Sequence, residues 1–305
     1  MTKLAQEILQ NYQIRKTKAQ KTAFIELMQA RFPELRVETG GTPKSRNLVI
    51  GDVDTAKVVF AAHYDTCAVL PFPNFITPKN PMIFVLYNLL ICIPLLAVMV
   101  AVCVGLMLLT DSFLVAWLGM LAVLAAFFWM LVGGRPNVHT VNDNTSGVVT
   151  LCELYEAMTE EERQSAAFVF FDFEEAGMFG SALFYKMHKA EMKNKLLVNF
   201  DCVSDGDTLL IIRSKKAREA YGEAIEEAFG SAAEKTVRLE KSATTLYPSD
   251  QTQFPCHVAV AAMKRARFVG LYMDKIHTKH DTVFDERNIE YLTQSARRLT
   301  QKLSS

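Results

Sequence analysis

The chain of 305 residues has no net charge and no regular cysteine framework. Lys plus Arg and Asp plus Glu each number 33, so no overall field favours a nucleic acid or another charged polymer as a partner. The six cysteines form no CxxC pair and follow no regular spacing, which predicts reduced thiols. The sequence also contains no internal repeat and no low-complexity segment. Activity and partners must therefore be inferred from particular sites.

The N-terminal segment has no run of apolar residues followed by a small-residue cleavage site. Charges are spread throughout residues 1–21, so we expect no secretory signal and no export through a cleaved leader. Between residues 4 and 31, apolar side chains recur at helical spacing among the charges. This pattern predicts one or two amphipathic helices.

Hydrophobic residues make up 50% of the chain, which is near the top of the range for soluble proteins. They are concentrated between residues 82 and 132. Residues 83–109 and 113–132 contain no charged side chain, and three residues separate these two segments. Roughly 20 apolar residues span the roughly 30 Å hydrocarbon core of a bilayer. The segments therefore predict a transmembrane helical hairpin that binds membrane lipid. Two buried core helices are the alternative, but such helices are usually shorter and carry a polar face.

A hairpin that crosses the membrane twice leaves both of its flanks on one side. The flanks carry Lys79 and Arg135, whereas the turn carries only Asp111. The positive-inside rule then predicts an integral membrane protein with its catalytic body on the cytoplasmic side. The lack of charge inside either segment argues against a channel or transporter. Neither segment contains GxxxG, which leaves the oligomeric state open.

Outside the hairpin, strand-like and helix-like patterns alternate. Apolar runs predict strands at 47–50, 57–62, 166–171, 197–200, 209–212, 257–262 and 268–271. Helices are expected at 146–158, 181–195, 217–229 and 286–303. This alternation predicts an α/β fold with a mostly parallel central sheet flanked by helices. Residues 1–81 and 133–305 would form one domain, interrupted by the inserted hairpin at 82–132.

Side chains that suit metal binding follow several predicted strands. They are His63 and Asp65 after KVVFAA, Glu174 and Glu175 after AAFVFFDF, and Asp201 after LLVNF. In open α/β sheets, functional groups collect at the carboxyl ends of the strands. A single His or Glu in such a place is more often structural, but together these residues predict a metal site.

Five short segments resemble, in order, the motifs of peptidase family M28, the zinc aminopeptidases and related enzymes. The segments are HYDT at 63–66, NDNTSG at 142–147, FEEAGMFGS at 173–181, NFD at 199–201 and IHTKHDT at 276–282. The resemblance covers nearly the whole chain apart from the hairpin. It implies a zinc-peptidase-like fold and a membrane-anchored metallopeptidase that acts on peptides, in the first place an aminopeptidase that releases N-terminal residues.

The resemblance also implies two Zn²⁺ ions per chain and five metal ligands, which are His63, Asp143, Glu175, Asp201 and His277. Asp143 would bridge both ions, with His63 and Asp201 completing one site and Glu175 and His277 the other. Such a pair of ions can activate a shared water and polarise the scissile carbonyl.

Two further residues receive catalytic roles from the resemblance. Asp65 would hydrogen-bond the His63 ring and fix its tautomer, and Glu174 would act as the general base. His280 competes with His277 as a ligand, but the order of residues in IHTKHDT favours His277.

The sequence departs from the family pattern at three places. Gln251 stands where a histidine is common, and Ile276 replaces a frequent tyrosine whose hydrogen bond to the reaction intermediate is worth a few kcal/mol in comparable sites. The hairpin replaces a short loop between the first two metal motifs. We therefore expect an active site that faces the bilayer and acts on membrane-bound or emerging peptides.

Two other functions fit the same fold. One is a glutaminyl-cyclase-like acyltransferase, which typically uses one zinc ion, and the other is a catalytically inactive membrane scaffold. Retention of all five ligands argues against the cyclase, and retention of Glu174 with those ligands argues against the scaffold.

Overall fold

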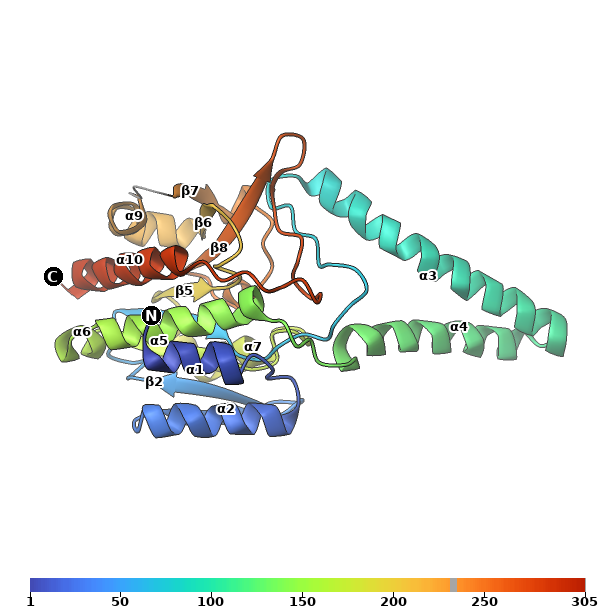
Figure 1. Cartoon of the computed structure of the whole chain (residues 1–305), viewed down its shortest axis with the longest axis horizontal. Helices are drawn as coiled ribbons and strands as arrows, with labels where there is room; N and C mark the ends of the chain where they lie inside the picture. The colour runs from blue at the N-terminus through green and yellow to red at the C-terminus, as the bar shows by residue number, and fades with distance from the viewer. Residues whose placement is uncertain (231–234, 305) are drawn as a thin grey trace.

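The computed structural model describes residues 1–230 and 235–304, which form a mixed β-sheet with helices on both faces (Figure 1). The strand order is β1-β2-β4-β3-β5-β8-β6-β7, with β9 paired to β8. The strands are β1 (Arg36–Gly40), β2 (Ser45–Ile50), β3 (Val58–His63), β4 (Ala166–Phe171), β5 (Leu196–Phe200), β6 (Thr208–Arg213), β7 (Thr236–Lys241), β8 (His257–Ala266) and β9 (Gly270–Tyr272). The central strands β4, β3, β5 and β8 are parallel to one another. The antiparallel pairs β2/β4 and β6/β8 join the outer strands to this centre. The predicted α/β fold is confirmed, with the parallel strands at the middle of the sheet.

The helices divide between the two faces of the sheet. They are α1 (Lys3–Asn11), α2 (Lys18–Arg31), α5 (Ser146–Ala157), α6 (Glu160–Gln164), α7 (Phe179–Met187), α8 (Lys189–Met192), α9 (Lys215–Phe229) and α10 (Glu286–Ser304). Side chains of α1, α2, α5, α9 and α10 pack with Phe60 and Ala62 in one core. Phe184 of α7 and Met192 of α8 pack with Val59 and Ala61 on the opposite face. Alternate residues of β3 thus serve two cores, which explains the continuous apolar run in this strand.

Most strand and helix predictions match the structure within a few residues, and two local predictions need correction. The helix expected at 181–195 is two helices that meet at His188, whose Nε2 lies 3.0 Å from Glu38 Oε2. Strands β1 and β7 were not predicted, because both lie at edges of the sheet and have no buried residue to mark them. The turn between β1 and β2 contains Gly41 at a φ of 75°, a left-handed conformation that glycine adopts without strain.

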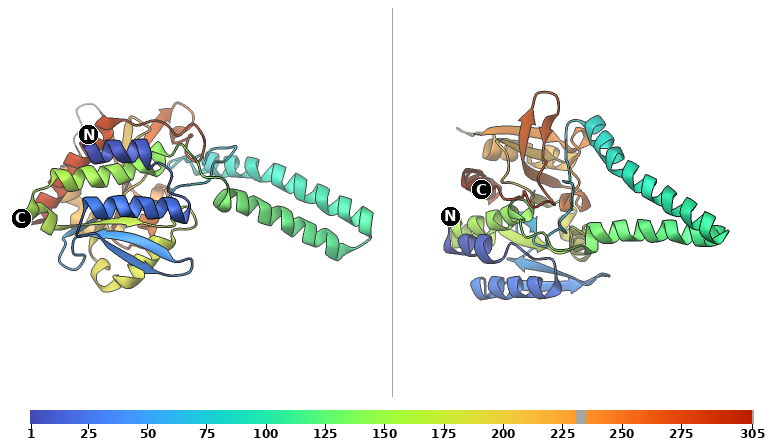
Figure 2. Two further views of the ribbon diagram at one scale, coloured as in Figure 1. Left: turned by 60° about the horizontal axis from the view of Figure 1, so that its bottom comes forward. Right: turned by 45° about the vertical axis from the view of Figure 1, so that its right-hand side comes forward.

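The predicted hairpin is a pair of long helices that project from the body (Figures 1 and 2). It comprises α3 (Pro81–Thr110) and α4 (Phe113–Phe128), with the π-helical turn η1 (Trp129–Gly133) continuing α4. The two candidate spans, of 30 and 21 residues, are long and apolar enough to cross a membrane. Among the described residues of these helices, Ala116 is the one buried side chain. The segments are therefore not packed as core helices, and the apolar surface that they expose needs another partner.

Lys21 of α2 and Asp172, which directly follows β4, form a buried ion pair. The Lys21 Nζ lies 2.5 Å from Asp172 Oδ1, and the two side chains are 5% and 1% exposed. The backbone N–H groups of Arg46 and Phe173 also donate to this carboxylate. Burial is the largest cause of the raised pKa of Asp172, and the Asp65 carboxylate adds to it.

Lys21→Met is expected to lower the free energy of unfolding by about 3 to 5 kcal/mol, because it leaves a buried carboxylate without its cation. Thermal unfolding in detergent, followed by circular dichroism, measures this effect. Lys18→Met on the exposed face of the same helix is the control and should change stability by less than about 0.5 kcal/mol. An unchanged stability of Lys21→Met would contradict a stabilising role of this ion pair. Adding Asp172→Asn to Lys21→Met should restore much of the lost stability, because it removes the unpaired carboxylate.

Candidate metal centre

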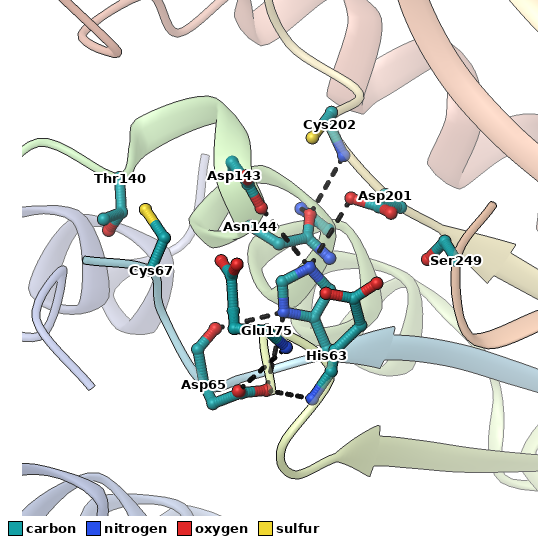
Figure 3. A network of polar contacts seen from close by, with 12 residues as sticks. His63, Asp65, Cys67, Thr140, Asp143, Asn144, Glu175, Asp201, Cys202 and Ser249 are labelled. Carbon is teal, nitrogen blue, oxygen red and sulfur yellow. Dashed lines mark hydrogen bonds and ion pairs between the residues drawn. The ribbon is translucent and has the colours of Figure 1, made fainter. Parts of the chain in front are cut away.

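Parallel strands bring the candidate ligands to one edge of the sheet. His63 is the last residue of β3 and is paired with Phe171, the last residue of β4. Glu175 follows β4, and Asp201 follows directly after Phe200, the last residue of β5. Because β3, β4 and β5 run in the same direction, their carboxyl ends meet, and Figure 3 shows these side chains converging. The sequence-based placement at the strand ends agrees with this geometry.

The first group of donors contains His63, Asp143 and Asp201. The His63 Nε2 lies 3.4 Å from Asp143 Oδ1 and 3.5 Å from Asp201 Oδ1. On the other side of the ring, Nδ1 lies 3.0 Å from the backbone carbonyl oxygen of Asp65. This contact assigns the N–H to Nδ1 and leaves Nε2 directed at the two carboxylates.

The second group of donors contains His277, Glu175 and the same Asp143. The His277 Nε2 lies 3.2 Å from Asp143 Oδ2 and 3.2 Å from Glu175 Oε2. Asp143 therefore presents one carboxylate oxygen to each histidine. Burial raises the pKa of Asp143, but the two imidazoles outweigh burial and hold it below its ordinary value. The structure thus brings together all five residues predicted as ligands, in two groups that share Asp143.

The side chains of Asp281 and Asn144, which both belong to the sequence motifs, hold the backbone around Asp143. The carboxylate of Asp281 accepts hydrogen bonds from the backbone N–H groups of Asn142 and Asp143, each at 2.9 Å. The Asn144 side chain accepts from the backbone N–H of Cys202 and donates to the carbonyl of Phe200. These contacts join the Asp143 segment to the end of β5, where Asp201 lies.

Asp65 positions the loop that carries Glu174 and Glu175. Its carboxylate accepts the backbone N–H of Glu174 at 3.0 Å and that of Glu175 at 3.3 Å. The same carboxylate lies 3.6 Å from the His63 Nδ1, farther than the Asp65 carbonyl. Asp65 therefore orients the ring through its main chain and the loop through its side chain.

Glu174 lies beside the two donor groups in a desolvated and acidic environment. The pKa of Glu174 is raised well above its ordinary value, and burial is the largest cause of this shift. His63 opposes this shift, whereas the carboxylates of Asp250 and Asp201 add to it. Both oxygens of Asp250 are buried without a hydrogen-bond partner among the described residues. The acidic character of this side of the site suits a cationic group.

Arg15 connects two segments that carry metal donors, and no motif in the sequence indicates this role. It is fully buried, and its Nε donates to the carbonyl oxygen of Tyr64 at 2.5 Å. Its Nη1 and Nη2 donate to Thr145 Oγ1 at 3.1 and 3.2 Å. Arg15 thus joins the end of β3 to the segment that follows Asp143. The contact is long-range in sequence, so only the folded chain shows it.

Gln251 and Ile276, two of the three departures from the family pattern, are buried. Gln251 donates from Nε2 to the Tyr247 carbonyl and accepts from Asn199, so its amide is used inside the protein. Tyr247 in turn donates its hydroxyl to the Asp201 carbonyl at 3.0 Å. Ile276 is 2% exposed, and the competing His280 is exposed at the surface.

The donor set suits a divalent cation. Glu175 Oε1 and Asp201 Oδ1 are buried and have no hydrogen-bond partner within the described part of the chain. Three carboxylates and two imidazoles face one another there, and uncompensated carboxylates are costly to bury. Imidazole nitrogen and carboxylate oxygen are common ligands of Zn²⁺. The residues present therefore fit zinc.

Residues 131–299 match the family model described as Peptidase family M28, which is more than half of the chain. The chain belongs to peptidase family M28. The family supports a zinc-dependent hydrolase with a peptide substrate, so the predicted family is confirmed. No curated protein matches the sequence.

Solved structures show the same fold at low sequence identity. The Legionella pneumophila aminopeptidase LapA is 12% identical with a TM-score of 0.57, covering 99% of this chain and 68% of that chain. A Porphyromonas gingivalis glutaminyl cyclase is 15% identical with a TM-score of 0.60, covering 98% of this chain and 96% of that chain. A Zn-dependent exopeptidase from Parabacteroides distasonis is 14% identical with a TM-score of 0.53, covering 98% and 94%. This M28 protein thus shares its fold with both peptidases and a cyclase.

Proposed function

We propose that this M28 protein is a membrane-anchored aminopeptidase with two zinc ions per chain. The observation that carries the proposal is the position of Asp143, whose two oxygens face separate histidines. His63 and Asp201 would complete one zinc site, and Glu175 and His277 the other. When bound, the two ions would supply an activated water and an electrophile that polarises the peptide carbonyl.

Glu174 is the proposed general base and acid. It takes a proton from the attacking water and delivers it to the leaving amine nitrogen, the two transfers that peptide hydrolysis needs. Asp65 supports this role because it fixes the backbone N–H of Glu174. A free α-ammonium group of the substrate would find carboxylates nearby, including Glu175, which lines the cavity at the metal centre. This acidic surrounding favours substrates with an unblocked N-terminus.

Glutaminyl cyclase activity is the second candidate, because the P. gingivalis enzyme shares the fold over nearly its full length. To separate the two, we would purify the chain in detergent and count bound zinc. Release of leucine from unblocked and N-acetylated peptides would be followed beside cyclisation of N-terminal glutamine. Two zinc ions and cleavage of unblocked peptides alone would support the aminopeptidase. One zinc ion with cyclisation would support the cyclase, and no turnover would support the scaffold.

We also propose that the site opens toward the membrane. A cavity of about 570 Å³ is lined by Glu175 at the metal centre and by Trp129 and Val132 at the end of the hairpin. A second cavity of about 540 Å³ is lined by Tyr247 and by Pro81, where α3 begins. Both cavities thus combine catalytic-domain residues with the base of one membrane helix. A peptide on the bilayer surface would have short access to the metals.

In this proposal, residues 82–132 anchor one catalytic domain formed by residues 1–81 and 133–305. Lys79 and Arg135 flank the hairpin, which favours the cytoplasmic side for that domain. The exposed Trp129 near the end of α4 suits the interface between lipid and water.

Replacing residues 82–132 with a flexible Gly/Ser linker is expected to move the protein from the membrane fraction to the soluble fraction. Because the five ligands and Glu174 lie outside the hairpin, zinc content and cleavage of a soluble peptide should persist. Cleavage of a peptide embedded in liposomes should fall strongly, because the anchor no longer concentrates the enzyme there. Unchanged activity on the embedded peptide would refute the membrane-facing site.

A further inference from the structure

Cys67 lies beside the second group of metal donors. It follows Asp65 by two residues and is 1% exposed. Its sulfur belongs to a set of four possible ligand atoms, with one atom each from Asp143, Glu175 and His277, that all lie within 4.8 Å of one another. Figure 3 shows Cys67 next to Asp143 and Glu175, on the side away from Asp201. The group of His63, Asp143 and Asp201 contains no cysteine.

The surroundings of Cys67 suit a sulfur ligand. The Nδ2 of Asn137 lies 3.8 Å from the Cys67 sulfur as a hydrogen-bond donor, and the Asn137 backbone N–H donates to the Cys67 carbonyl. The same Nδ2 lies 2.9 Å from the carbonyl oxygen of Thr278, the residue after His277. Asn137 therefore holds Cys67 and the His277 segment together. A hydrogen bond to a ligating atom is the usual support of a metal ligand.

A second observation is that a carboxylate oxygen on this side of the site has no hydrogen-bond partner among the described residues. This oxygen is Glu175 Oε1, which is buried. The Glu175 side chain is only 9% exposed, so solvent offers this oxygen little compensation. A cation between Cys67, Glu175 and His277 would satisfy this oxygen. The buried Cys67 thiol thus lies beside three possible metal donors and belongs to none of the three apolar core clusters.

We infer that Cys67 is a fourth protein ligand of the metal held by Glu175, His277 and Asp143. The inference rests on the proposed metal centre and deepens it. On binding, the thiol loses its proton to solvent and the thiolate donates its electron pair to the metal. The two sites then differ, because one has four protein ligands and the other has three.

This asymmetry assigns different duties to the two sites. Four protein donors are typical of a tightly held zinc ion, whereas three donors leave a position open for water. The site of His63, Asp201 and Asp143 would therefore carry the exchangeable, catalytic position. A thiolate also favours zinc over harder ions such as Mn²⁺ or Mg²⁺.

Cobalt substitution tests the inference directly. The full-length protein in detergent, loaded with Co²⁺, is expected to show thiolate-to-cobalt charge-transfer absorption in the near ultraviolet. Cys67→Ser should abolish this absorption, and Cys152→Ser, which changes another buried cysteine outside the centre, should retain it. No absorption in the unchanged protein, or its persistence in Cys67→Ser, would overturn the inference.

Zinc retention gives a second measurement. With a chelator present, Cys67→Ser should release one zinc ion about tenfold faster or more, while Cys152→Ser behaves like the unchanged protein. If Cys67→Ser does not fold, X-ray absorption of the unchanged zinc protein decides: a Zn–S distance of about 2.3 Å supports the ligand, and its absence refutes it. These signals do not depend on turnover. A sulfur signal without peptide hydrolysis would reject the proposed function alone.

Discussion

Glu174→Gln is expected to lower kcat for peptide hydrolysis by about 10²- to 10⁴-fold, because the amide cannot accept the proton of the attacking water. The substitution keeps the size of the side chain and the backbone N–H that Asp65 holds. Zinc content and thermal stability should therefore remain unchanged. Initial rates on an unblocked peptide, measured at saturating zinc, give the effect.

The matched control is Glu26→Gln, a substitution of the same kind on the exposed face of α2. It should leave kcat and zinc content as they were. An unchanged kcat in Glu174→Gln would exclude Glu174 as the base. A loss of zinc in parallel with activity would instead assign Glu174 to metal binding.

Asp143→Asn should remove zinc from both proposed sites, because one carboxylate serves the two donor groups. By comparison, Asp201→Asn changes a residue of one group and should cost one ion. Elemental analysis after dialysis would then give two ions for the unchanged protein, about one for Asp201→Asn and fewer than one for Asp143→Asn, since each ligand lost weakens its own site. Activity should fall with the number of ions.

The fold provides the control for this comparison. Asp281 binds the backbone N–H groups at 142 and 143, which both variants keep, so circular dichroism should be unchanged. Equal zinc loss in Asp143→Asn and Asp201→Asn would contradict a shared carboxylate. Retention of both ions in Asp143→Asn would remove Asp143 from the proposed ligands.

The parts of the fold that were predictable have strong local patterns. Strands β3, β4 and β5 are buried along their whole length, so their sequences are apolar apart from His63 and Asn199. The long uncharged segments of α3 and α4 are equally clear. By contrast, β1 and β7 lie at the edges and have no buried residue, which removes the apolar signal.

The candidate site followed the same rule. His63, Glu175 and Asp201 stand at the ends of apolar strands, and parallel pairing brings such ends together. Arg15 and Cys67 carry no such signal. Each acts through contacts with segments distant in the sequence, such as Arg15 with Thr145 and Cys67 with Glu175.

By itself, the sequence determined the buried strands, most of the helices, the apolar hairpin and the residue types of a metal site, because these depend on local periodicity and composition. Tertiary structure alone decided how the donors divide. It placed one oxygen of Asp143 before each histidine and the Asp65 carbonyl behind His63. It also placed Cys67 beside only one of the two groups. Such choices depend on distances of a few ångströms between separate strands and loops, which one-dimensional spacing does not contain.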